Sequence, residues 1–421
     1  MRALVVASVA SVVSLVAACG EDPCKGVSGQ CIAVHAGASA QDAQAALISV
    51  APGGTVAFSA GTFDFRVDLS LDVANVTVVG EGADKTILSF AKQTEGAQGL
   101  LVTASSGFAI RDLAIENTPG DALKILGTTG VTIERTRVEW TAGPNTTNGA
   151  YGLYPVQCAN VRIDGNTVKG ASDSGIYVGQ SDTIVVTNND VENNVAGIEI
   201  ENSSHAEVFG NVATNNTGGI LVFNLPGLQV ETAAGTSVHD NMIFSNNTPN
   251  FAPNGNIVGL VPTGTGFAVL AAHGVEFFAN TVRDHKTVNV GVISWVPLMK
   301  DAMDPTYDQY PTAVYVHDND LSGTSDMPTG ELGALLISAI GEIMPNGPFV
   351  VPDIVWDGVK DPKRVQASTG DYADADKICI QRNGAASYMN LAWPLGDATK
   401  PSTDLSPHDC SHPSLPPVTI P

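Results

Sequence analysis

A repeat of 22 to 39 residues constrains the fold of this chain more than any other feature. Six octapeptides carry an asparagine at their sixth position, and the steps between those asparagines are 23, 22, 30, 39 and 39 residues. The octapeptides are VRIDGNTV (161–168), IVVTNNDV (184–191), AEVFGNVA (206–213), TSVHDNMI (236–243), VEFFANTV (275–282) and VYVHDNDL (314–321). An earlier copy at 131–138 has Thr136 in the asparagine position. A unit this short cannot bury an apolar face alone, so the repeats are expected to stack into a solenoid.

A second motif alternates with the first and reveals the type of secondary structure. GIYVGQS, GIEIENS and GILVFNL begin at Gly175, Gly197 and Gly219, with 22 residues between successive glycines. Apolar and variable residues alternate within each copy, which predicts strands with one buried face, Ile176 pointing inward and Tyr177 outward. Short strands in a 22-residue repeat without helices predict an all-β fold, a single-stranded right-handed parallel β-helix over residues 39–345.

The recurrent asparagines have a structural explanation in such a fold. Asparagine tolerates the left-handed backbone of a tight corner, and stacked amides can hydrogen-bond along the axis as a ladder. We therefore expect Asn166, Asn189, Asn211 and their counterparts to hold the corners together. The longer steps indicate loops inserted into single coils, and such loops often carry binding sites.

Both ends of the predicted solenoid need caps, because an open end exposes strand edges. Ser39 and Asp42 form a capping-box pattern, and an apolar stripe follows at helical spacing (Ala43, Ala46, Leu47 and Val50). This stretch resembles the N-terminal cap helix of the pectin-lyase-like superfamily. After residue 345 the repeat fades, so residues 346–421 are predicted to be an irregular C-terminal tail laid along the helix.

The N-terminus predicts export and lipid anchoring. Residues 1–18 have the charged start and short apolar run of a signal peptide, and Val16-Ala17-Ala18-Cys19 matches a bacterial lipobox. We expect lipidation of Cys19 and a tether over residues 19–38; the alternative is an ordinary signal peptide with a chance cysteine. Gly20 after the lipobox cysteine resembles a sorting signal for the outer membrane, so the expected location is the cell envelope, at the outer membrane or its periplasmic face.

The cysteines fit an oxidising compartment. Six are present, and after Cys19 they suggest one disulfide between Cys24 and Cys31 and another between Cys379 and Cys410, with Cys158 left in an undetermined state. No CxxC pair supports a zinc site, and no cofactor or metal is predicted. Calcium remains the alternative, because four aspartates lie near coil edges: Asp182, Asp190, Asp240 and Asp318.

The net charge of −23 argues against nucleic acid and against an anionic membrane surface as partners, since both require a basic face. Membrane contact is expected only through the lipid, and we expect a monomer. His239 and His317, which recur in VHDN, are interpreted as surface histidines two rungs apart, about 10 Å, too far for one metal ion.

The coils YGLYPVQC, ASDSGIYVGQS, AGIEIENS and GNVATNNTGGILVFNLP resemble a bacterial family of parallel β-helix repeat lipoproteins over roughly residues 51–347. That family has no assigned activity to carry over. Its members are encoded beside c-type cytochrome-like lipoproteins, so the resemblance implies an envelope protein of that kind as a partner. The short stretch YGLYPV also resembles the Y-G-x-D-P-H motif of polysaccharide epimerases, but Tyr154 and Val156 replace its acid and its imidazole. Epimerase chemistry by that mechanism is therefore not expected.

Enzymes of the pectin-lyase-like superfamily act on the outer face of one sheet, so the outward residues are the candidate site. The catalytic candidates are Tyr154, Tyr177, Lys124 and Glu199, and the ligand-binding candidates are Gln157, Gln180, Glu201, Asn202 and Asn224. Tyrosine faces stack on sugars, amides pair with hydroxyls, Lys124 can neutralise a uronate, and Glu199 can act as a base. Two functions follow. The favoured one is non-catalytic binding of a glycan or partner protein by this face and the loops at 141–149 and 244–264. The alternative is a uronate lyase or epimerase.

Overall fold

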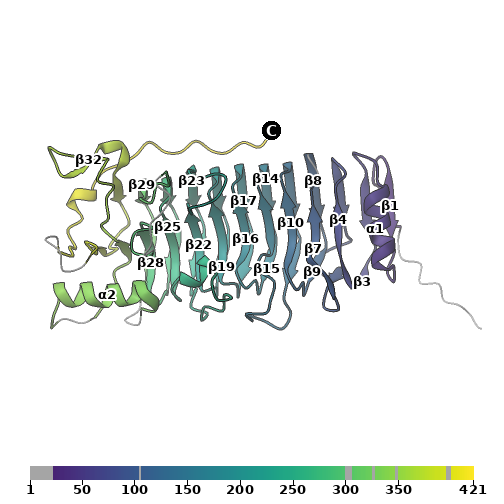
Figure 1. The fold of residues 1–421 in the computed structure, drawn as a ribbon, viewed down its shortest axis with the longest axis horizontal. Helices are drawn as coiled ribbons and strands as arrows, with labels where there is room; N and C mark the ends of the chain where they lie inside the picture. Colours follow the sequence, from purple (N-terminus) through teal and green to yellow (C-terminus); the bar gives the residue numbers. More distant parts are fainter. Residues whose placement is uncertain (1–21, 104–105, 299–305, 325–327, 347–348, 395–399) are drawn as a thin grey trace, which may run out of the picture.

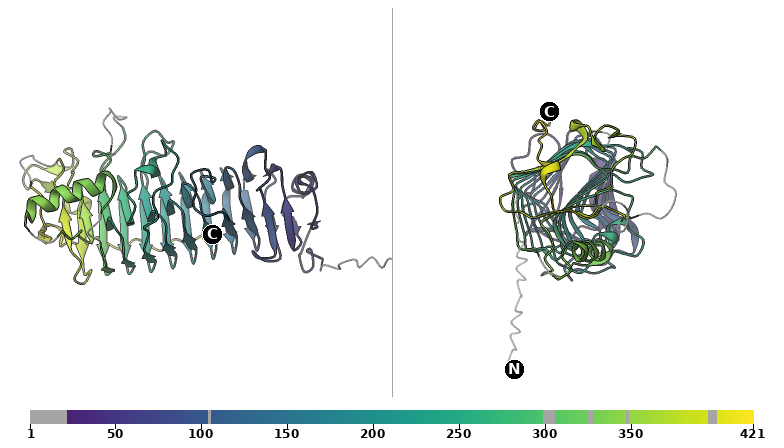
Figure 2. Two further views of the ribbon diagram at one scale, coloured as in Figure 1. Left: turned by 90° about the horizontal axis from the view of Figure 1, so that it is seen from below. Right: turned by 90° about the vertical axis from the view of Figure 1, so that its left-hand side faces the viewer.

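The computed structural model describes residues 22–103, 106–298, 306–324, 328–346, 349–394 and 400–421. Over these residues the strands wind into an elongated coil, with its rungs stacked from the N-terminal to the C-terminal end (Figure 1). Three parallel sheets form its faces, which Figure 2 shows end-on. The prediction of a right-handed parallel β-helix is confirmed. The predicted signal peptide and Cys19 lie outside the described residues.

Each sheet takes one strand from each coil. Sheet 1 is 12-stranded: β1 (Cys31–Val34), β2 (Thr55–Phe58), β5 (Val76–Val79), β8 (Ser106–Arg111), β11 (Thr129–Glu134), β14 (Ala159–Asp164), β17 (Asp182–Thr187), β20 (Ser204–Phe209), β23 (Ala234–His239), β26 (His273–Phe278), β29 (Thr312–His317) and β34 (Ile378–Gln381). Sheet 2 is 11-stranded: β4 (Val67–Leu71), β7 (Glu95–Val102), β10 (Asp121–Leu126), β13 (Leu153–Val156), β16 (Ser174–Gly179), β19 (Ala196–Glu201), β22 (Gly218–Phe223), β25 (Thr265–Leu270), β28 (Val288–Ile293), β31 (Ile354–Trp356) and β35 (Tyr388–Asn390). Sheet 3 is 10-stranded: β3 (Gly61–Asp64), β6 (Thr86–Ser89), β9 (Ala114–Glu116), β12 (Arg137–Glu139), β15 (Thr167–Lys169), β18 (Asp190–Glu192), β21 (Val212–Thr214), β24 (Met242–Phe244), β27 (Thr281–Arg283) and β30 (Asp320–Ser322).

The N-terminal cap forms as the sequence predicts. Helix α1 (Ala40–Ser49) starts with a capping box, in which the Ser39 hydroxyl accepts from the Asp42 N–H and Asp42 accepts from the Ser39 N–H. Ala43 and Leu47 are buried against the first coil. Among the described helices, none is long and apolar enough to cross a bilayer.

The repeated asparagines form a continuous amide ladder inside the solenoid. Asn166 donates from Nδ2 to Oδ1 of Asn189, which donates in the same way to Asn211, both at 2.9 Å. The ladder continues through Asn241, Asn280, Asn319 and Asn383. The predicted ladder is confirmed.

The predicted reason for the asparagines is only half right. The left-handed backbone belongs to the residue before each ladder position, for example Gly165 (φ 67°), Asn188 (φ 55°) and Asp240 (φ 52°). The ladder residue itself is buried and satisfies backbone groups at the corner, as when Asn189 donates to the carbonyl of Ile163. At each corner, one residue therefore adopts the left-handed backbone and the next residue supplies the buried amide of the ladder.

A second ladder, not predicted from the sequence, runs through the corner between sheets 3 and 2. Asn194 donates from Nδ2 to Oδ1 of Asn216, Asn216 donates to Asn246, and the Asn246 amide lies 3.1 Å from Nε2 of His285. Burial lowers the pKa of His285 to about 4, so this imidazole is neutral and can accept from Asn246.

The solenoid extends beyond both predicted boundaries. In the predicted tether, Cys31–Val34 already pairs with β2. The prediction that residues 346–421 are irregular is wrong for Ile354–Trp356, Ile378–Gln381 and Tyr388–Asn390, which add the last rungs of sheets 1 and 2. These strands escaped the repeat pattern because long insertions separate them, including the antiparallel pair β32 (Val365–Gln366) and β33 (Asp371–Tyr372). Short 3-10 turns cover Ile257–Leu260, Asp374–Asp376 and Ser406–His408.

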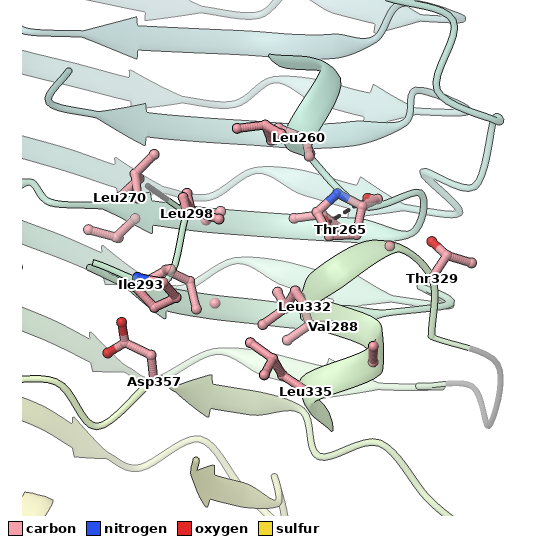
Figure 3. A pocket seen from close by; sticks show the side chains of 18 of the residues that line it. Leu260, Thr265, Leu270, Val288, Ile293, Leu298, Thr329, Leu332, Leu335 and Asp357 are labelled. Carbon is pink, nitrogen blue, oxygen red and sulfur yellow. Dashed lines mark hydrogen bonds between the residues drawn. The ribbon is translucent and has the colours of Figure 1, made fainter. Parts of the chain in front are cut away.

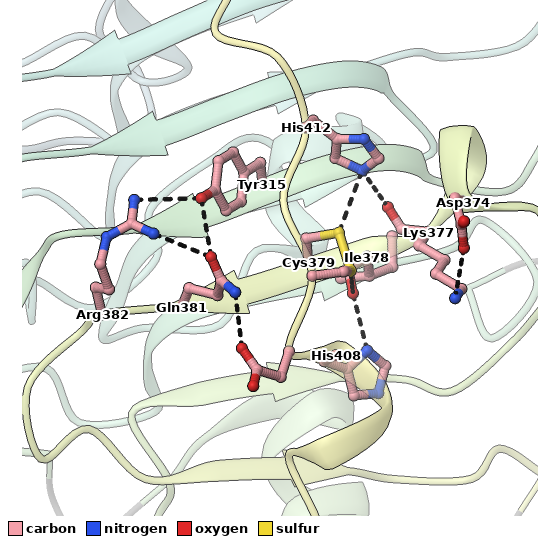
Figure 4. Close-up of a disulfide and its surroundings, with 11 residues drawn as sticks. Tyr315, Asp374, Lys377, Ile378, Cys379, Gln381, Arg382, His408 and His412 are labelled. Carbon is pink, nitrogen blue, oxygen red and sulfur yellow. Dashed lines mark hydrogen bonds and ion pairs between the residues drawn. A yellow bond between two sulfur atoms is a disulfide. The ribbon is translucent and has the colours of Figure 1, made fainter.

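The final residues lie along sheet 1 as an extended strap, here defined as residues 411–421 (Figure 1). A disulfide between Cys379 and Cys410 fixes its start, and Figure 4 shows the hydrogen bonds around it. A second disulfide joins Cys24 to Cys31, and Cys158 is a buried free thiol. Farther along, the Leu415 N–H donates to Glu276 and the Val418 N–H donates to Glu207.

His317 is buried and His239 is half-buried, which corrects the interpretation of both as surface histidines. His239 stacks between Phe209 and Phe278 with ring centroids 5.1 and 4.8 Å apart. Its Nε2 contacts Glu207, and Nε2 of His317 contacts Glu276 at 3.1 Å. The imidazoles are packed into an aromatic row and contact the two glutamates that accept hydrogen bonds from the strap.

Candidate functional site

The candidate site lies on the outer face of sheet 2, and the strand register reproduces the predicted outward columns. Lys124 pairs with Tyr154, Tyr177 pairs with Glu199, and Glu199 pairs with Leu221. Tyr154 and Tyr177 lie between the paired residues Leu153–Ile176 and Val156–Gly179, so the column is continuous. The second column includes Gly179, Glu201 and Phe223.

Three tyrosines and three carboxyl groups meet there, and we call them the tyrosine–carboxyl cluster (Tyr151, Tyr154, Tyr177, Asp173, Glu199 and Glu201). The Tyr151 ring lies 4.4 Å from that of Tyr154 and 4.8 Å from that of Tyr177, measured between centroids. Tyr151 reaches the face from the turn before β13, although the sequence prediction counted it only as an epimerase-motif residue. Its place in the cluster could not be read from strand alternation.

The carboxyl groups of the cluster hold at least one proton. The Ser174 hydroxyl contacts both Asp173, at 3.1 Å, and Glu199. A hydroxyl has a single hydrogen to donate, so one of these carboxyls must be protonated and donate in return. Glu199 also hydrogen-bonds to Glu201, which again requires a shared proton.

Burial raises the pKa of all three carboxyls. It raises the pKa of Asp173 to about 6 and that of Glu201 to about 7, while the pKa of Glu199 is raised further above its usual range by burial and by the charges of Glu201 and Asp173. Burial also raises the pKa of Tyr154 to about 12 and those of Tyr151 and Tyr177 beyond it. The tyrosines are therefore neutral hydrogen-bond donors at physiological pH.

The face is open at one end and covered at the other. Lys124 and Tyr154 are partly exposed, whereas Tyr177 is 5% exposed, Glu199 3% and Leu221 0%. The cover comes from residues 225–233 and from the inserted loop at 244–264, where Asn256 donates to Asp173 at 3.0 Å. Tyr177 and Glu199 therefore lie beneath the cover in this structure, and their role as catalytic candidates stays a prediction.

The predicted amide column holds the covering loop rather than facing solvent. Gln180 accepts from the Gln229 N–H at 2.9 Å, Asn202 donates to Leu225 and Val230 carbonyls, and Asn224 donates to the Ala233 carbonyl. Glu201 is likewise 8% exposed and bonded to Tyr177. Glu201, Asn202 and Asn224 are buried polar groups that need such partners. Gln180 is half-buried and also holds the loop, whereas the half-buried Gln157 lies at the open end.

The open end has its own polar geometry. The Lys124 ammonium lies 4.6 Å from the centroid of the Tyr154 ring and 3.6 Å from the Asp121 carboxylate. The charge of Lys124 is thus compensated locally. In the described residues no group of three or more His, Cys, Asp or Glu side chains is arranged to hold a metal ion.

A large apolar cavity, which was not predicted from the sequence, lies farther along the same face. It has a volume of about 700 Å³ and begins at Phe223, the register partner of Glu201 (Figure 3). Helix α2 (Gly330–Ile343) forms one wall, with Leu332 and Leu335 pointing into the cavity. The helix itself was not predicted, because its position within the last long insertion hid it from the repeat pattern.

Comparisons with known proteins agree with this architecture. Residues 98–248 and 148–296 match a family model described as right handed beta helix region. The protein is a right-handed parallel β-helix protein.

Solved structures with this fold are distant in sequence. The A-module of mannuronan C-5 epimerase AlgE6 from Azotobacter vinelandii is 18% identical, with 68% of this chain and 83% of that chain covered and a TM-score of 0.46. An alginate lyase from Paenibacillus sp. str. FPU-7 is 16% identical, with 70% and 95% covered and a TM-score of 0.40. A family 28 exopolygalacturonase from Yersinia enterocolitica is 13% identical, with 78% and 71% covered and a TM-score of 0.41. No curated protein matches the sequence. At these identities the likeness concerns the fold alone.

Proposed function

We propose that this protein is an exported, lipid-anchored envelope protein that binds a glycan without cleaving it, at the open end of the tyrosine–carboxyl cluster. One observation carries the proposal: two partly exposed tyrosine rings, Tyr151 and Tyr154, pack 4.4 Å apart at the edge of a face lined with fixed carboxyl groups. Aromatic faces stack on sugar rings, and the partly exposed Asp121 carboxylate at the same end can accept hydrogen bonds from sugar hydroxyls.

The charges at this end favour a neutral glycan over a uronate polymer. Lys124 is the cation nearest the rings and is already paired with Asp121. The carboxyl groups of Asp173, Glu199 and Glu201 lie on the covered part of the same face. The chain as a whole has a net charge of −23. A uronate would bring a further carboxylate to these like charges, and Lys124, the cation described beside the rings, is already paired, which costs binding energy.

The protonation state of the tyrosines supports binding rather than elimination or epimerisation. A tyrosine base must lose its proton, but burial raises the pKa of Tyr154 to about 12 and that of Tyr151 further. These groups can donate hydrogen bonds to a sugar, whereas tyrosinate formation is unfavourable at neutral pH.

A polysaccharide-active enzyme is the second candidate, and one observation favours it. Glu201, with a pKa raised to about 7, and Asp173, with a pKa raised to about 6, resemble carboxyl groups poised to act as acids near neutral pH. For this chemistry the cover at 225–233 and Asn256 must move aside, because Glu201 is 8% exposed.

A glycan array of neutral and uronate oligosaccharides, read for binding and then for products, separates these functions. The uronate wells are read at 232 nm for unsaturated products, and all wells are assayed for new reducing ends. Binding of neutral glycans without products supports the proposal. Products in any well support the enzyme. Absence of both binding and products contradicts the glycan proposal, and a partner protein of the envelope is then the expected ligand. The same array with a chelator tests whether calcium contributes.

A further inference from the structure

The apolar cavity beside helix α2 is a second candidate site, distinct from the tyrosine–carboxyl cluster. Its volume of about 700 Å³ falls in the range of small-molecule sites, which are mostly apolar and lie in concave surfaces. It is bounded by sheet 2, by α2 and by the turn Ile257–Leu260 (Figure 3).

The cavity exists because the outward column of sheet 2 becomes small at this point. Earlier rungs carry Tyr177, Glu199 and Leu221 in this column, and the next two carry Ala268 and Gly291. A Cβ atom added to Gly291 would have its nearest neighbours at 3.8–3.9 Å, which is ordinary contact distance. Neither close approach nor a left-handed backbone requires glycine here, so the missing side chain serves to leave space.

The cavity is elongated along the solenoid axis. Its lining comes from β22, β25 and β28 and then from Asp357 and Leu391, which follow β31 and β35. These are consecutive strands of sheet 2. At about 4.8 Å between neighbouring strands, the lining spans about 19 Å, which suits an extended chain better than a compact ring.

The lining is mainly aliphatic, with Phe223 and Trp393 as its aromatic members, and its carboxylate, Asp357, is already paired. Leu270, Ile293 and Leu298 are typical of the walls. The Asp357 carboxylate accepts hydrogen bonds from the Ser294 N–H and hydroxyl at 2.7 and 2.6 Å, and from the Val359 N–H. The described lining includes no Lys, Arg or His, so an anionic head group would find no counterion and would face Asp357.

The cavity is reached past the turn Ile257–Leu260. Ile257 and Leu260 line it and are 36% and 46% exposed, respectively. Large apolar side chains at the rim of an apolar cavity give an entering chain a continuous apolar path.

We propose that this cavity binds a single long, neutral aliphatic chain, such as that of a fatty alcohol or a monoacylglycerol. Binding replaces water in the cavity by methylene groups, whose transfer from water into an apolar environment is favourable. The polar end of the ligand stays at the rim beside Leu260, where it needs no charged partner.

The test is displacement of the apolar fluorescent probe N-phenyl-1-naphthylamine from the purified, detergent-free protein. Wild-type protein should enhance the fluorescence of the probe, and 1-dodecanol should reverse the enhancement at concentrations at least tenfold below those needed with dodecanoate. Gly291→Leu and Ala268→Leu fill the cavity from two strands and should each weaken probe binding at least tenfold. Thr132→Leu, which adds the same side chain on an outward position of sheet 1, should bind the probe like wild type.

Circular dichroism and thermal unfolding establish that each variant is folded. A filled cavity should leave the melting temperature of the ligand-free variant equal or higher, while 1-dodecanol should raise the melting temperature of wild type alone. No fluorescence enhancement with wild type would overturn the proposal. So would probe binding that both filled variants retain, or a dimer that excludes the probe because a second copy covers the cavity. If one of the two filled variants does not fold, the other variant and the change in the melting temperature of wild type with 1-dodecanol decide the outcome.

Discussion

The Tyr177 hydroxyl donates a hydrogen bond to Oε1 of Glu201 at 2.5 Å, across two neighbouring strands of sheet 2 and under a covering loop. Burial raises the pKa of Glu201 to about 7, and this bond moderates the rise. The outer face of the solenoid therefore contains groups that exchange protons within the physiological pH range. Their protonation is coupled to the stability of the coil.

The first prediction concerns stability against pH. Glu201 and Asp173 titrate near pH 7 and 6 in the folded protein, but near their ordinary values of 4.5 and 3.8 when unfolded. Between those values the folded state binds more protons, so the free energy of unfolding should fall as pH rises from about 5 to 8. Urea unfolding at a series of pH values measures this slope.

Matched variants isolate the contribution of the cluster. Glu201→Gln keeps the shape and removes the titration, so it should flatten the slope between pH 5 and 8. Glu192→Gln changes an outward glutamate of sheet 3 and should leave the slope as in wild type. An equal slope in wild type and Glu201→Gln would show that this carboxyl is not protonated in the folded state. Tyr177→Phe should shift the titration to higher pH, because the bond that lowers the Glu201 pKa is lost.

The second prediction concerns the open end of the cluster. Tyr154→Leu removes both a stacking face and the ring that Lys124 overlies, so the affinity for a neutral oligosaccharide should fall about tenfold. Lys124→Met keeps the apolar stem and should weaken binding by less than about fivefold, since Lys124 is paired with Asp121. Isothermal titration calorimetry provides the affinities.

The control for these variants is Phe209→Leu, which removes a partly exposed aromatic ring from sheet 1. It should bind sugar like wild type. If Lys124→Met abolished binding while Tyr154→Leu did not, the ligand would be recognised through charge, and a uronate would replace the neutral glycan in the proposal.

How much the sequence predicts depends on how local the determinant is. Strand alternation fixed the inward and outward positions correctly from Lys124 to Phe223, because the alternation is a property of each short segment. It could not show that the loop carrying Asn256 folds back over Asp173, 83 residues away, since a loop has no periodicity. The cavity was not predicted for another reason. It exists because Ala268 and Gly291 have no large side chain, and a small residue in a repeat cannot be told from ordinary sequence variation. Fold was therefore predictable and accessibility was not.

The third prediction tests the asparagine ladder. Asn241 donates from Nδ2 to Asn280 and to the Val208 carbonyl, and its Oδ1 accepts from the N–H and the amide of Asn211. Asn241→Leu has a similar volume but leaves these buried groups without partners, at a cost of roughly 1–3 kcal/mol for each group. The midpoint of urea unfolding should fall clearly. Asn145→Leu, on an exposed loop, should shift it little, and a comparable shift in both variants would contradict a stabilising ladder.

The fourth prediction concerns the strap at residues 411–421. Leu415 and Val418 are three residues apart, about 9.3 Å in a polyproline II chain, and their N–H groups bond to Glu276 and Glu207. Those glutamates lie on β26 and β20, two strand spacings or about 9.6 Å apart. Pro416 and Pro417, which lie between the two bonded residues, have no N–H to donate and so cannot extend a strand ladder. The strap is instead held by two hydrogen bonds whose spacing along the strap matches the spacing of the two glutamates.

Replacing both glutamates (Glu207→Leu with Glu276→Leu) removes the acceptors of Val418 and Leu415 and should release the strap downstream of the Cys379–Cys410 disulfide. Hydrogen exchange measured by mass spectrometry should become at least tenfold faster for the peptide that contains Leu415 and Val418, while the core strands keep their protection. Glu134→Leu, an outward glutamate of sheet 1 elsewhere on the solenoid, should leave the exchange of the strap unchanged. Unchanged protection in the double variant would mean that apolar packing on the row of Phe278 and His317, rather than the two carboxylates, holds the strap.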